Sequence, residues 1–256
     1  MVDTIVYTTL KVFIFSWKEI IIMRHNKRIY KTLIAILSLS FILNLTTISF
    51  SNNSEDNFVK NGSRDKKIIA LTFDDGPHPK ETLEVLDVLK KYDVKATFFI
   101  AGKHANWYSK PLLRAIKENH EIGNHTFNHP DISKLSESQI EDEILKCEEI
   151  LIKLTGKKPT LFRPAFGSYN ENSLTSIANK LGYKIILWNT VDAKDWENPS
   201  SNKIANTIID NAKNGDIILL HDYGTENTVK ALDILIPIMQ KKGFKFVTVS
   251  QLINNK

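Results

Sequence analysis

The sequence predicts an α/β fold with parallel strands, and its pattern favours a barrel over an open sheet. Strand-like and helix-like segments alternate from Lys66 to the C-terminus, in about seven pairs. Glycines at positions 156, 182 and 243 stand where helix C-caps are expected, just before the next strand. Groups of polar residues directly follow the strands, and in an α/β barrel that end of the strands forms the active-site face.

The individual segments follow from local composition and periodicity. The predicted strands are short runs rich in β-branched and aromatic residues, and they cover residues 67–73, 95–102, 120–126, 159–167, 183–190, 215–222 and 244–250. Amphipathic periodicity predicts helices that include residues 79–92, 109–119, 136–156, 171–182 and 228–243.

An export segment is expected before the domain. The stretch Met23–Lys31 is strongly basic, and residues 32–50 form an uncharged apolar run of near-spanning length. This order predicts an N-terminal helix over residues 23–51 that is either a cleaved signal peptide or an uncleaved membrane anchor. Residues 1–22 are then an upstream extension, and our hypothesis is that translation starts at Met23 rather than at Met1.

The folded domain is expected to begin after a linker. Residues 52–65 are polar and without periodicity, which is typical of a linker. We therefore expect one domain over residues 66–256. Its single cysteine, Cys147, excludes an internal disulfide and lies in a helical pattern, which favours a half-buried structural residue over a reactive thiol.

The charge of the chain excludes little but weakens one class of function. The formal net charge is +5 in 256 residues, and the lysines are scattered through the sequence. A nucleic-acid-binding protein would gather them into a stripe with a stacking platform, so no nucleic-acid partner is expected. An anionic cell-wall polymer suits a modest positive charge equally well.

Five polar groups follow predicted strands, and we expect them to converge on one pocket. They are Asp74–Asp75, the "HTFNH" stretch from His125 to His129, the "RPAFG" stretch from Arg163, the "DAKDW" stretch from Asp192, and His221–Asp222.

The two histidines of "HTFNH" indicate a metal site. His125 and His129 have i, i+4 spacing, so both imidazoles face one ion if the segment forms a helical turn. A carboxylate from the aspartate pair would complete three protein ligands and leave a position for water or substrate, as in catalytic rather than structural zinc sites. Thr126 stands where a zinc protease of the "HExxH" type has glutamate, so the protease reading is excluded.

The other groups offer acid, base and positioning residues. Alternating directions at a strand end would let one aspartate bind metal while its neighbour stays free as a base. Arg163 could hold a carboxylate by a bidentate pair. His221 follows an apolar strand and can act as a general acid if Asp195 or Asp192 orients it.

These five motifs together, "TFDDGP", "HTFNH", "FRPAFG", "DAKDW" and "LLHD" in this order, resemble those of the NodB-homology polysaccharide deacetylases, carbohydrate esterase family 4. The resemblance covers Lys66 to the C-terminus. It implies a distorted (β/α)7 TIM-like barrel and metal-dependent removal of N-acetyl, or sometimes O-acetyl, groups from glycans.

The resemblance also implies roles for residues. Asp75, His125 and His129 resemble the metal ligands, and Asp74 the base that takes a proton from the attacking water. His221 resembles the acid that protonates the leaving amine. Arg163 resembles the partner of Asp74, and Asp195 the carboxylate that tunes His221, with Asp192 ranked second.

The same resemblance assigns the substrate side of the pocket to Phe166, Trp196, Leu219 and Pro164. Leu219 resembles the apolar wall beside the acetyl methyl group, while Trp196 can stack on a sugar or belong to the core. The family's arginine motif often reads Arg-Pro-Pro-Tyr-Gly, and here Ala165 and Phe166 replace its second proline and its tyrosine. Phe166 keeps the backbone N–H that the family aims at the oxyanion but loses any contact from a tyrosine hydroxyl.

The expected function is N-deacetylation of N-acetylglucosamine residues in peptidoglycan or a related glycan, by an exported monomer in the cell wall or on the outer face of the membrane. Chitin oligomers, poly-N-acetylglucosamine and N-acetylmuramic acid stay open as substrates. Zinc is the expected divalent metal, with cobalt and nickel as alternatives. The competing hypotheses are an O-acetyl esterase acting on xylan and a non-catalytic glycan-binding module.

Overall fold

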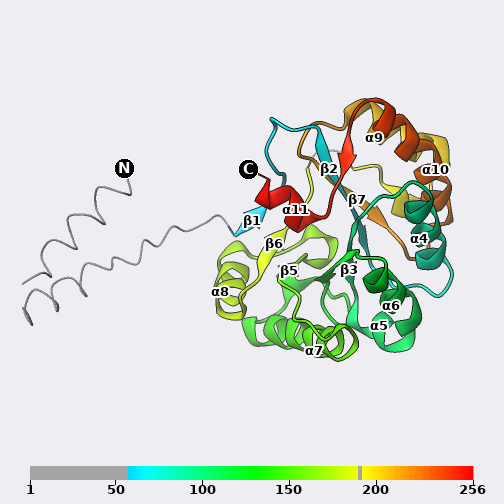
Figure 1. The fold of residues 1–256 in the computed structure, drawn as a ribbon. Coiled ribbons are helices and arrows are strands. Elements are labelled where there is room, and N and C mark those ends of the chain that lie inside the picture. The colour runs from blue at the N-terminus through cyan, green and yellow to red at the C-terminus, as the bar shows by residue number, and fades with distance from the viewer. Residues whose placement is uncertain (1–56, 190–191, 256) are drawn as a thin grey trace, which may run out of the picture. The chain divides into compact units, whose positions relative to one another are not determined.

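The structure, a computed structural model, describes residues 57–189 and 192–255. Their strands form one parallel sheet in the order β1-β6-β5-β4-β3-β2-β7, with β8 added beside β2 (Figure 1). The strands are β1 (Phe58–Val59), β2 (Ile68–Asp74), β3 (Thr97–Ile100), β4 (Glu121–Asn124), β5 (Leu161–Phe162), β6 (Lys184–Ile186), β7 (Ile217–His221) and β8 (Lys245–Phe246).

The sheet curves into a barrel-like fold with helices around its outside (Figure 1). Two isolated bridges lie at the β7 end of the sheet. A parallel one joins Asp192 to Leu219 of β7, and an antiparallel one joins Asn61 to Asp216, the residue before β7. The predicted α/β class with parallel strands is thereby confirmed, in the form of a half-barrel.

The helices connect the strands in the alternation that the sequence predicts. They are α4 (Glu81–Lys91), α5 (Gly102–Trp107), α6 (Ser109–Lys117), α7 (Glu137–Thr155), α8 (Glu171–Leu181), α9 (Ser201–Asn211), α10 (Glu226–Lys241) and α11 (Val249–Asn254), with short 3₁₀ turns η1 (Ile132–Lys134), η2 (Ala165–Gly167) and η3 (Asp195–Glu197). Gly156 and Gly182 cap α7 and α8 in the left-handed region, as predicted, whereas Gly243 lies one residue beyond the C-cap of α10.

The strand β2 pairs with three other strands and is buried along its whole length. All seven of its residues are buried, because β3, β7 and β8 pair with it and helices cover the outside. Phe73 of β2 stacks on Phe98 of β3 with ring centroids 5.1 Å apart. The register pairs Asp74 with His221, so the last residues of β2 and β7 reach the same level at the carboxyl edge.

The two ends of the domain differ from the sequence prediction, and helices α5 and α9 were not among the predicted helices. Phe58 and Val59 fall in the predicted linker, yet they form β1 and pair with Ile185 and Ile186, so the fold begins before Lys66. A two-residue strand is too short to show periodicity, which is why the sequence analysis missed it.

The predicted last strand, residues 244–250, is a strand only at Lys245–Phe246. Thr248 then caps α11 through a reciprocal pair of hydrogen bonds with Gln251. The Thr-x-x-Gln spacing is the sequence signature of a capping box, so α11 could have been predicted from it.

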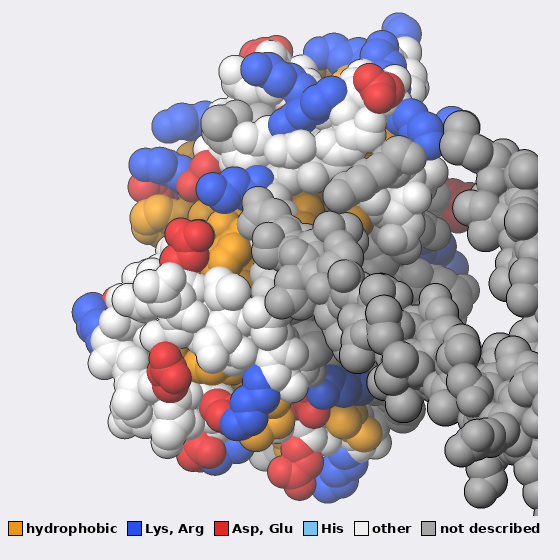
Figure 2. All heavy atoms as spheres, turned by 90° about the vertical axis from the view of Figure 1, so that its left-hand side faces the viewer, with side chains coloured by type: hydrophobic (Ala, Val, Ile, Leu, Met, Phe, Trp, Pro, Cys, Tyr) orange, Lys and Arg blue, Asp and Glu red, His pale blue; other side chains and the backbone are white. Residues whose placement is uncertain are grey.

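The remaining sequence predictions concern the N-terminus, the cysteine and the charge. Residues 1–56, including the expected extension and export segment, lie outside the described residues. Within the described ranges, no helix is both long and apolar enough to span a bilayer. On the described part of the face in Figure 2, Lys and Arg side chains lie among Asp and Glu side chains instead of forming a single stripe.

Cys147 is a structural core residue. It is fully buried on α7, and its thiol donates to the carbonyl of Ile100 at 3.3 Å. Burial raises the pKa of this thiol to about 12, so it is not a thiolate at neutral pH. Cys147 is therefore structural as predicted, but it is fully buried where a half-buried residue was expected.

Candidate active site

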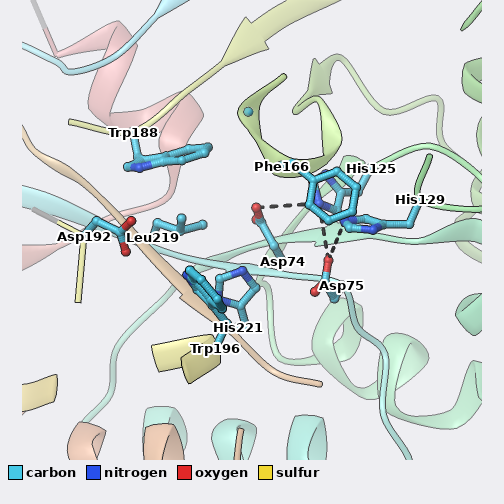
Figure 3. Close-up of a pocket in the computed structure, with 11 residues that line it drawn as sticks. Asp74, Asp75, His125, His129, Phe166, Trp188, Asp192, Trp196, Leu219 and His221 are labelled. Atoms are coloured by element: carbon cyan, nitrogen blue, oxygen red, sulfur yellow. Dashed lines mark ion pairs between the residues drawn. The ribbon is translucent and has the colours of Figure 1, made fainter. Parts of the chain in front are cut away.

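A pocket of about 370 Å³ opens at the carboxyl ends of the strands (Figure 3). Residues from all five polar groups of the sequence line it, as the fold class requires. The lining residues are Asp74, Asp75, His125, His129, Phe166, Gly167, Trp188, Asp192, Trp196, Leu219 and His221.

Three side chains on one side of this pocket point to a common centre. The ligand atoms of Asp75, His125 and His129 all lie within 4.8 Å of one another. Asp75 Oδ1 is 2.9 Å from His129 Nε2 and 3.5 Å from His125 Nε2. The predicted trio is therefore brought together, with both imidazoles above the same carboxylate oxygen (Figure 3).

The segment between the two histidines does not form the helical turn on which the spacing argument was conditional, yet the two imidazoles still converge. Thr126 and His129 both have positive φ, at 66° and 60°, and the stretch is irregular. The hydroxyl of Thr126 accepts a hydrogen bond from the His129 N–H at 3.1 Å. Glu143 of α7 accepts from the N–H groups of Phe127 and Asn128, at 3.1 and 2.7 Å, and thus supports the loop from outside.

The donor atoms of this trio fit a divalent metal ion. His125 Nδ1 lies 2.7 Å from the carbonyl of Arg163, and because a carbonyl only accepts, Nδ1 carries the proton and Nε2 keeps a free lone pair. Asp75 Oδ1 is buried and accepts no well-aligned hydrogen bond despite the nearby imidazoles. Two imidazole nitrogens and one carboxylate oxygen form a set that suits Zn²⁺, Co²⁺ or Ni²⁺.

The charge of Asp75 agrees with a role as ligand. Burial raises the pKa of this carboxyl, but the adjacent histidines His125 and His129 outweigh that effect and hold the pKa well below its usual range. The carboxylate is therefore ionised at neutral pH, as a metal ligand must be.

Asp74, the neighbour of Asp75, points to a different partner. It is 3% exposed, and its Oδ1 accepts a hydrogen bond from Arg163 Nη1 at 2.7 Å. Arg163 is wholly buried and also donates to the hydroxyl of Thr72 and to the carbonyls of Ile186 and Leu187. These bonds fix the guanidinium and leave Asp74 Oδ2 facing the metal trio, 3.7 Å from His125 Nε2. The Arg163 contact is through one nitrogen, so the predicted bidentate pair is not formed.

His221 enters the pocket from the end of β7 and is held by Asp195. Its Nδ1 lies 2.8 Å from Asp195 Oδ1, and its backbone N–H donates to Asp195 Oδ2 at 2.8 Å. Thr228 donates to the same Oδ2 at 2.7 Å, so the buried carboxylate is fully engaged. Burial lowers the pKa of His221, but the hydrogen bond and charge of Asp195 outweigh it and raise the pKa to about 9.

The structure separates the two aspartates that the sequence left open. Asp192 also lines the pocket, but its Oδ1 accepts the backbone N–H of Lys194, and its own backbone bridges Leu219. The geometry thus pairs His221 with Asp195, while Asp192 lies beside Leu219 in the pocket wall (Figure 3).

Aromatic side chains form the rim. Phe166 is 66% exposed and Trp196 57% exposed, so Trp196 is not a core residue. Trp188 stands across the pocket from them and packs so closely on Gly167 that a Cβ there would lie 2.6 Å from its ring. Trp188 was not predicted as a site residue, and its position two residues after the end of β6 was the available signal.

Of the two remaining predicted substrate-side residues, one lines the pocket and the other does not. Leu219 lines the pocket as expected and is 4% exposed. Pro164 is buried at the start of η2 and does not reach the pocket. The fixed φ of proline shapes the turn that presents Phe166, so Pro164 contributes through the backbone.

Fold and site together define a class of protein. A parallel α/β barrel with a two-histidine, one-aspartate metal site, a second carboxylate and a histidine–aspartate pair in one pocket is typical of a metal-dependent hydrolase.

Comparison with known proteins identifies the family. The sequence model for the polysaccharide deacetylase family matches residues 61–186. A peptidoglycan-N-acetylglucosamine deacetylase of Bacillus cereus is 43% identical over 194 residues, which are 75% of this chain and 90% of that protein. The chain belongs to the polysaccharide deacetylase family, carbohydrate esterase family 4, a family of metal-dependent hydrolases.

Solved structures agree with this assignment. A peptidoglycan N-acetylglucosamine deacetylase, crystallised with an N-hydroxybenzamide derivative, matches with a TM-score of 0.75 and 38% identity over 77% of this chain and 93% of that one. A family member from Bacillus anthracis described as a pseudoenzyme matches with a TM-score of 0.72 and 30% identity over 76% and 68%. Family membership alone therefore does not establish catalysis, which depends on the residues of each site.

Proposed function

We propose that this protein hydrolyses the N-acetyl groups of N-acetylglucosamine residues in cell-wall peptidoglycan or a related glycan. The observation that carries the proposal is the single pocket shared by a metal-ligand trio, a buried carboxylate at Asp74 and a histidine at His221. Amide hydrolysis needs a base for the water, charge stabilisation at the carbonyl oxygen and an acid for the leaving nitrogen. Each requirement has its own candidate here.

The trio Asp75, His125 and His129 would hold the metal, with Zn²⁺ as first choice and Co²⁺ or Ni²⁺ as alternatives. When bound, such an ion supplies Lewis-acid polarisation of the acetyl carbonyl and lowers the pKa of water.

Asp74 acts as the general base in this proposal. Its Oδ1 is occupied by Arg163, while Oδ2 faces the trio and is free to take a proton from the attacking water. The fixed guanidinium of Arg163 prevents the carboxylate from turning away.

The backbone N–H of Phe166 stabilises the oxyanion. Among the described residues it has no hydrogen-bond acceptor, so it is available to substrate. Removing a donor of this type costs other enzymes about 3–4 kcal/mol of transition-state stabilisation.

His221 acts as the general acid. With a pKa of about 9 it is protonated at neutral pH, and Asp195 keeps the proton-donating Nε2 directed into the pocket by holding Nδ1. The tetrahedral species collapses when this proton reaches the leaving nitrogen and gives a free amine. Trp196, Trp188 and Phe166 would pack on the sugar, and Leu219 on the acetyl methyl group.

The substrate choice follows from relatives and from export. The Bacillus cereus relative is named for peptidoglycan N-acetylglucosamine, and the basic and apolar stretch over residues 23–51 would carry the domain across the membrane to the wall. We propose a monomer that is located in the wall if that stretch is cleaved and is anchored to the membrane if it is not.

The test is release of acetate and of free amine from N-acetylglucosamine oligomers and from peptidoglycan, after chelation and after Zn²⁺ or Co²⁺ is added back. Release of both products only with metal is the expected result. Acetate without amine, from acetylated xylan alone, would replace the proposal by an O-acetyl esterase. No release from any substrate by metal-loaded protein would indicate a glycan-binding pseudoenzyme.

A further inference from the structure

We propose that Asp222 and His104 are positioning residues that clamp the peptide unit between Asp75 and Gly76, and thereby aim the Asp75 carboxylate at the metal. The inference rests on the metal-binding role of Asp75 in the proposed function. Neither residue lines the pocket, so neither is offered as a catalytic residue.

Both polar atoms of this one peptide unit are held by side chains. The carbonyl of Asp75 accepts a hydrogen bond from His104 Nδ1 at 2.6 Å, and the N–H of Gly76 donates to Asp222 Oδ1 at 3.1 Å. A peptide unit is planar, so two bonds at its opposite edges fix its rotation about the Asp75 Cα–C bond. The direction in which the Asp75 side chain leaves the backbone is fixed with it.

The backbone at Asp75 requires such support. Its φ is +75°, in the left-handed region that residues with a Cβ seldom adopt. Unfavourable backbone conformations persist where the surrounding structure over-determines them, and they gather at ligand-binding sites. The two hydrogen bonds provide this constraint directly beside the proposed ligand.

Asp222 is built closely around Gly76. It is 1% exposed, and a Cβ added to Gly76 would lie 2.4 Å from both of its carboxylate oxygens. Only glycine permits this approach. The second oxygen, Oδ2, accepts from the hydroxyl of Thr82 at 2.5 Å, and that hydroxyl accepts from the His78 N–H at 2.7 Å. The carboxylate is therefore itself held in place.

His104 links the same peptide to the histidine loop. It lies on α5, whose first N–H groups, from Gly102 and Lys103, donate to the carbonyls of Thr126 and Phe127 at 3.0 Å. The ring of Tyr223 stacks on His104 at 4.2 Å with planes 8° apart, which fixes the ring orientation. Thus α5 joins the loop that carries Asp75 to the loop that carries His125 and His129.

The experiment measures Zn²⁺ affinity of the full chain by competition with a chelating dye, without any glycan. Asp222→Ala and His104→Ala are expected to weaken Zn²⁺ binding about 10- to 100-fold, the usual effect of losing an outer support of a metal ligand. Asp222→Asn keeps an oxygen that can accept from Gly76, and His104→Asn places an amide N–H near the position of Nδ1. Both conservative variants are expected to bind within about threefold of wild type.

Two controls separate positioning from general instability. Asn106→Ala changes an exposed residue on α5 and should leave affinity unchanged. Leu252→Ala opens a cavity in the buried core at α11, and it should lower Tm without changing the Zn²⁺ Kd. If Asp222→Ala does not fold, the His104 pair decides the question alone.

Wild-type affinity in both alanine variants would overturn the proposal, as would equal losses in the alanine and asparagine variants or a comparable loss in Leu252→Ala. Because no glycan is present, failure of the proposed function is seen separately. A protein that binds Zn²⁺ with this variant pattern but releases no acetate would contradict the deacetylase proposal and leave the clamp standing.

Discussion

The floor and the rim of the pocket are built in opposite ways. On the floor, Asp74 and His221 are each held from behind by a buried residue that does not itself line the pocket, Arg163 and Asp195 respectively. Asp74, Arg163 and Asp195 are at most 3% exposed. On the rim, the side chains of Phe166 and Trp196 are more than half exposed. Charge is thus fixed where bonds would be broken, whereas apolar surface is offered where a sugar would rest.

The difference predicts a division of kinetic effects. Rigidly held charges act mainly on the transition state, because their field must be in place before reaction. Exposed aromatic surfaces bind ground state and transition state alike, which changes KM and leaves kcat unaltered. Floor substitutions should therefore lower kcat, and rim substitutions should raise KM.

The largest effect is expected from Asp74→Asn. The amide cannot accept a proton from water, so kcat should fall by about 10²- to 10⁴-fold. The amide oxygen still accepts from Arg163, so circular dichroism should show a folded protein. His221→Ala should lose turnover on a similar scale, through loss of the acid. Wild-type-like rates in either variant would contradict the assigned roles.

The next largest effect is expected from Asp195→Asn, which should change how kcat depends on pH. The pKa of His221 is about 9 in the fold against 6.5 as the ordinary value, so the acid should lose its proton, and kcat should fall, as the pH rises past about 9. Loss of the Asp195 charge should move this high-pH limb to lower pH, as a pH profile of kcat would record. An unmoved limb would show that another group carries it.

The same pair makes a stability prediction with a definite sign. A raised pKa means that the folded state prefers the protonated imidazole, so the contribution is complete below pH 6.5 and is lost as the pH rises to about 9. The difference in Tm between wild type and Asp195→Asn should therefore shrink from pH 6 to pH 9.5. A constant difference would show that the hydrogen bonds of Asp195 to the His221 backbone and Thr228 dominate instead.

A smaller effect is expected at the rim. Trp196→Ala removes a ring that would stack on the sugar, which should raise KM about 2- to 10-fold with kcat nearly unchanged. Leu113→Ala, at an exposed apolar residue of α6 outside the pocket, is the matched control and should change neither constant. A fall in kcat with constant KM for Trp196→Ala would erase the distinction between rim and floor.

The smallest effect is predicted at Cys147. A buried thiol with a pKa of about 12 should not react with a maleimide in the native protein, and treatment should leave activity unchanged. Mass analysis before and after unfolding measures this directly. Rapid labelling of the native protein would show that α7 opens readily.

The fold and much of the site could be predicted because the buried strands are continuous apolar runs in the sequence, and polar residues mark where these runs end. β2 and β7 were clear for this reason, and their ends carry Asp74 and His221. β1 was not predicted because a two-residue strand is too short to show hydrophobic periodicity. α11 was not predicted because its residues begin inside an apolar run typical of a strand, and only the capping box marks the start of the helix.

What the sequence could not supply was the direction of side chains set by long-range contacts. The choice between Asp192 and Asp195 depended on which carboxylate reaches His221 across 26 residues of chain. The convergence of His125 and His129 arises from positive φ values and from Glu143 of α7, not from helical spacing. The hydrogen bonds of Asp222 and His104 to one peptide unit were likewise invisible in sequence.

The most direct test compares kcat and KM of Asp74→Asn and Trp196→Ala on one N-acetylglucosamine oligomer, with metal content measured in both. The expected result is full metal in each, a collapse of kcat with Asp74→Asn, and a raised KM at normal kcat with Trp196→Ala. Normal kcat in metal-loaded Asp74→Asn would contradict the central claim that the buried carboxylate beside the metal trio performs the proton transfer.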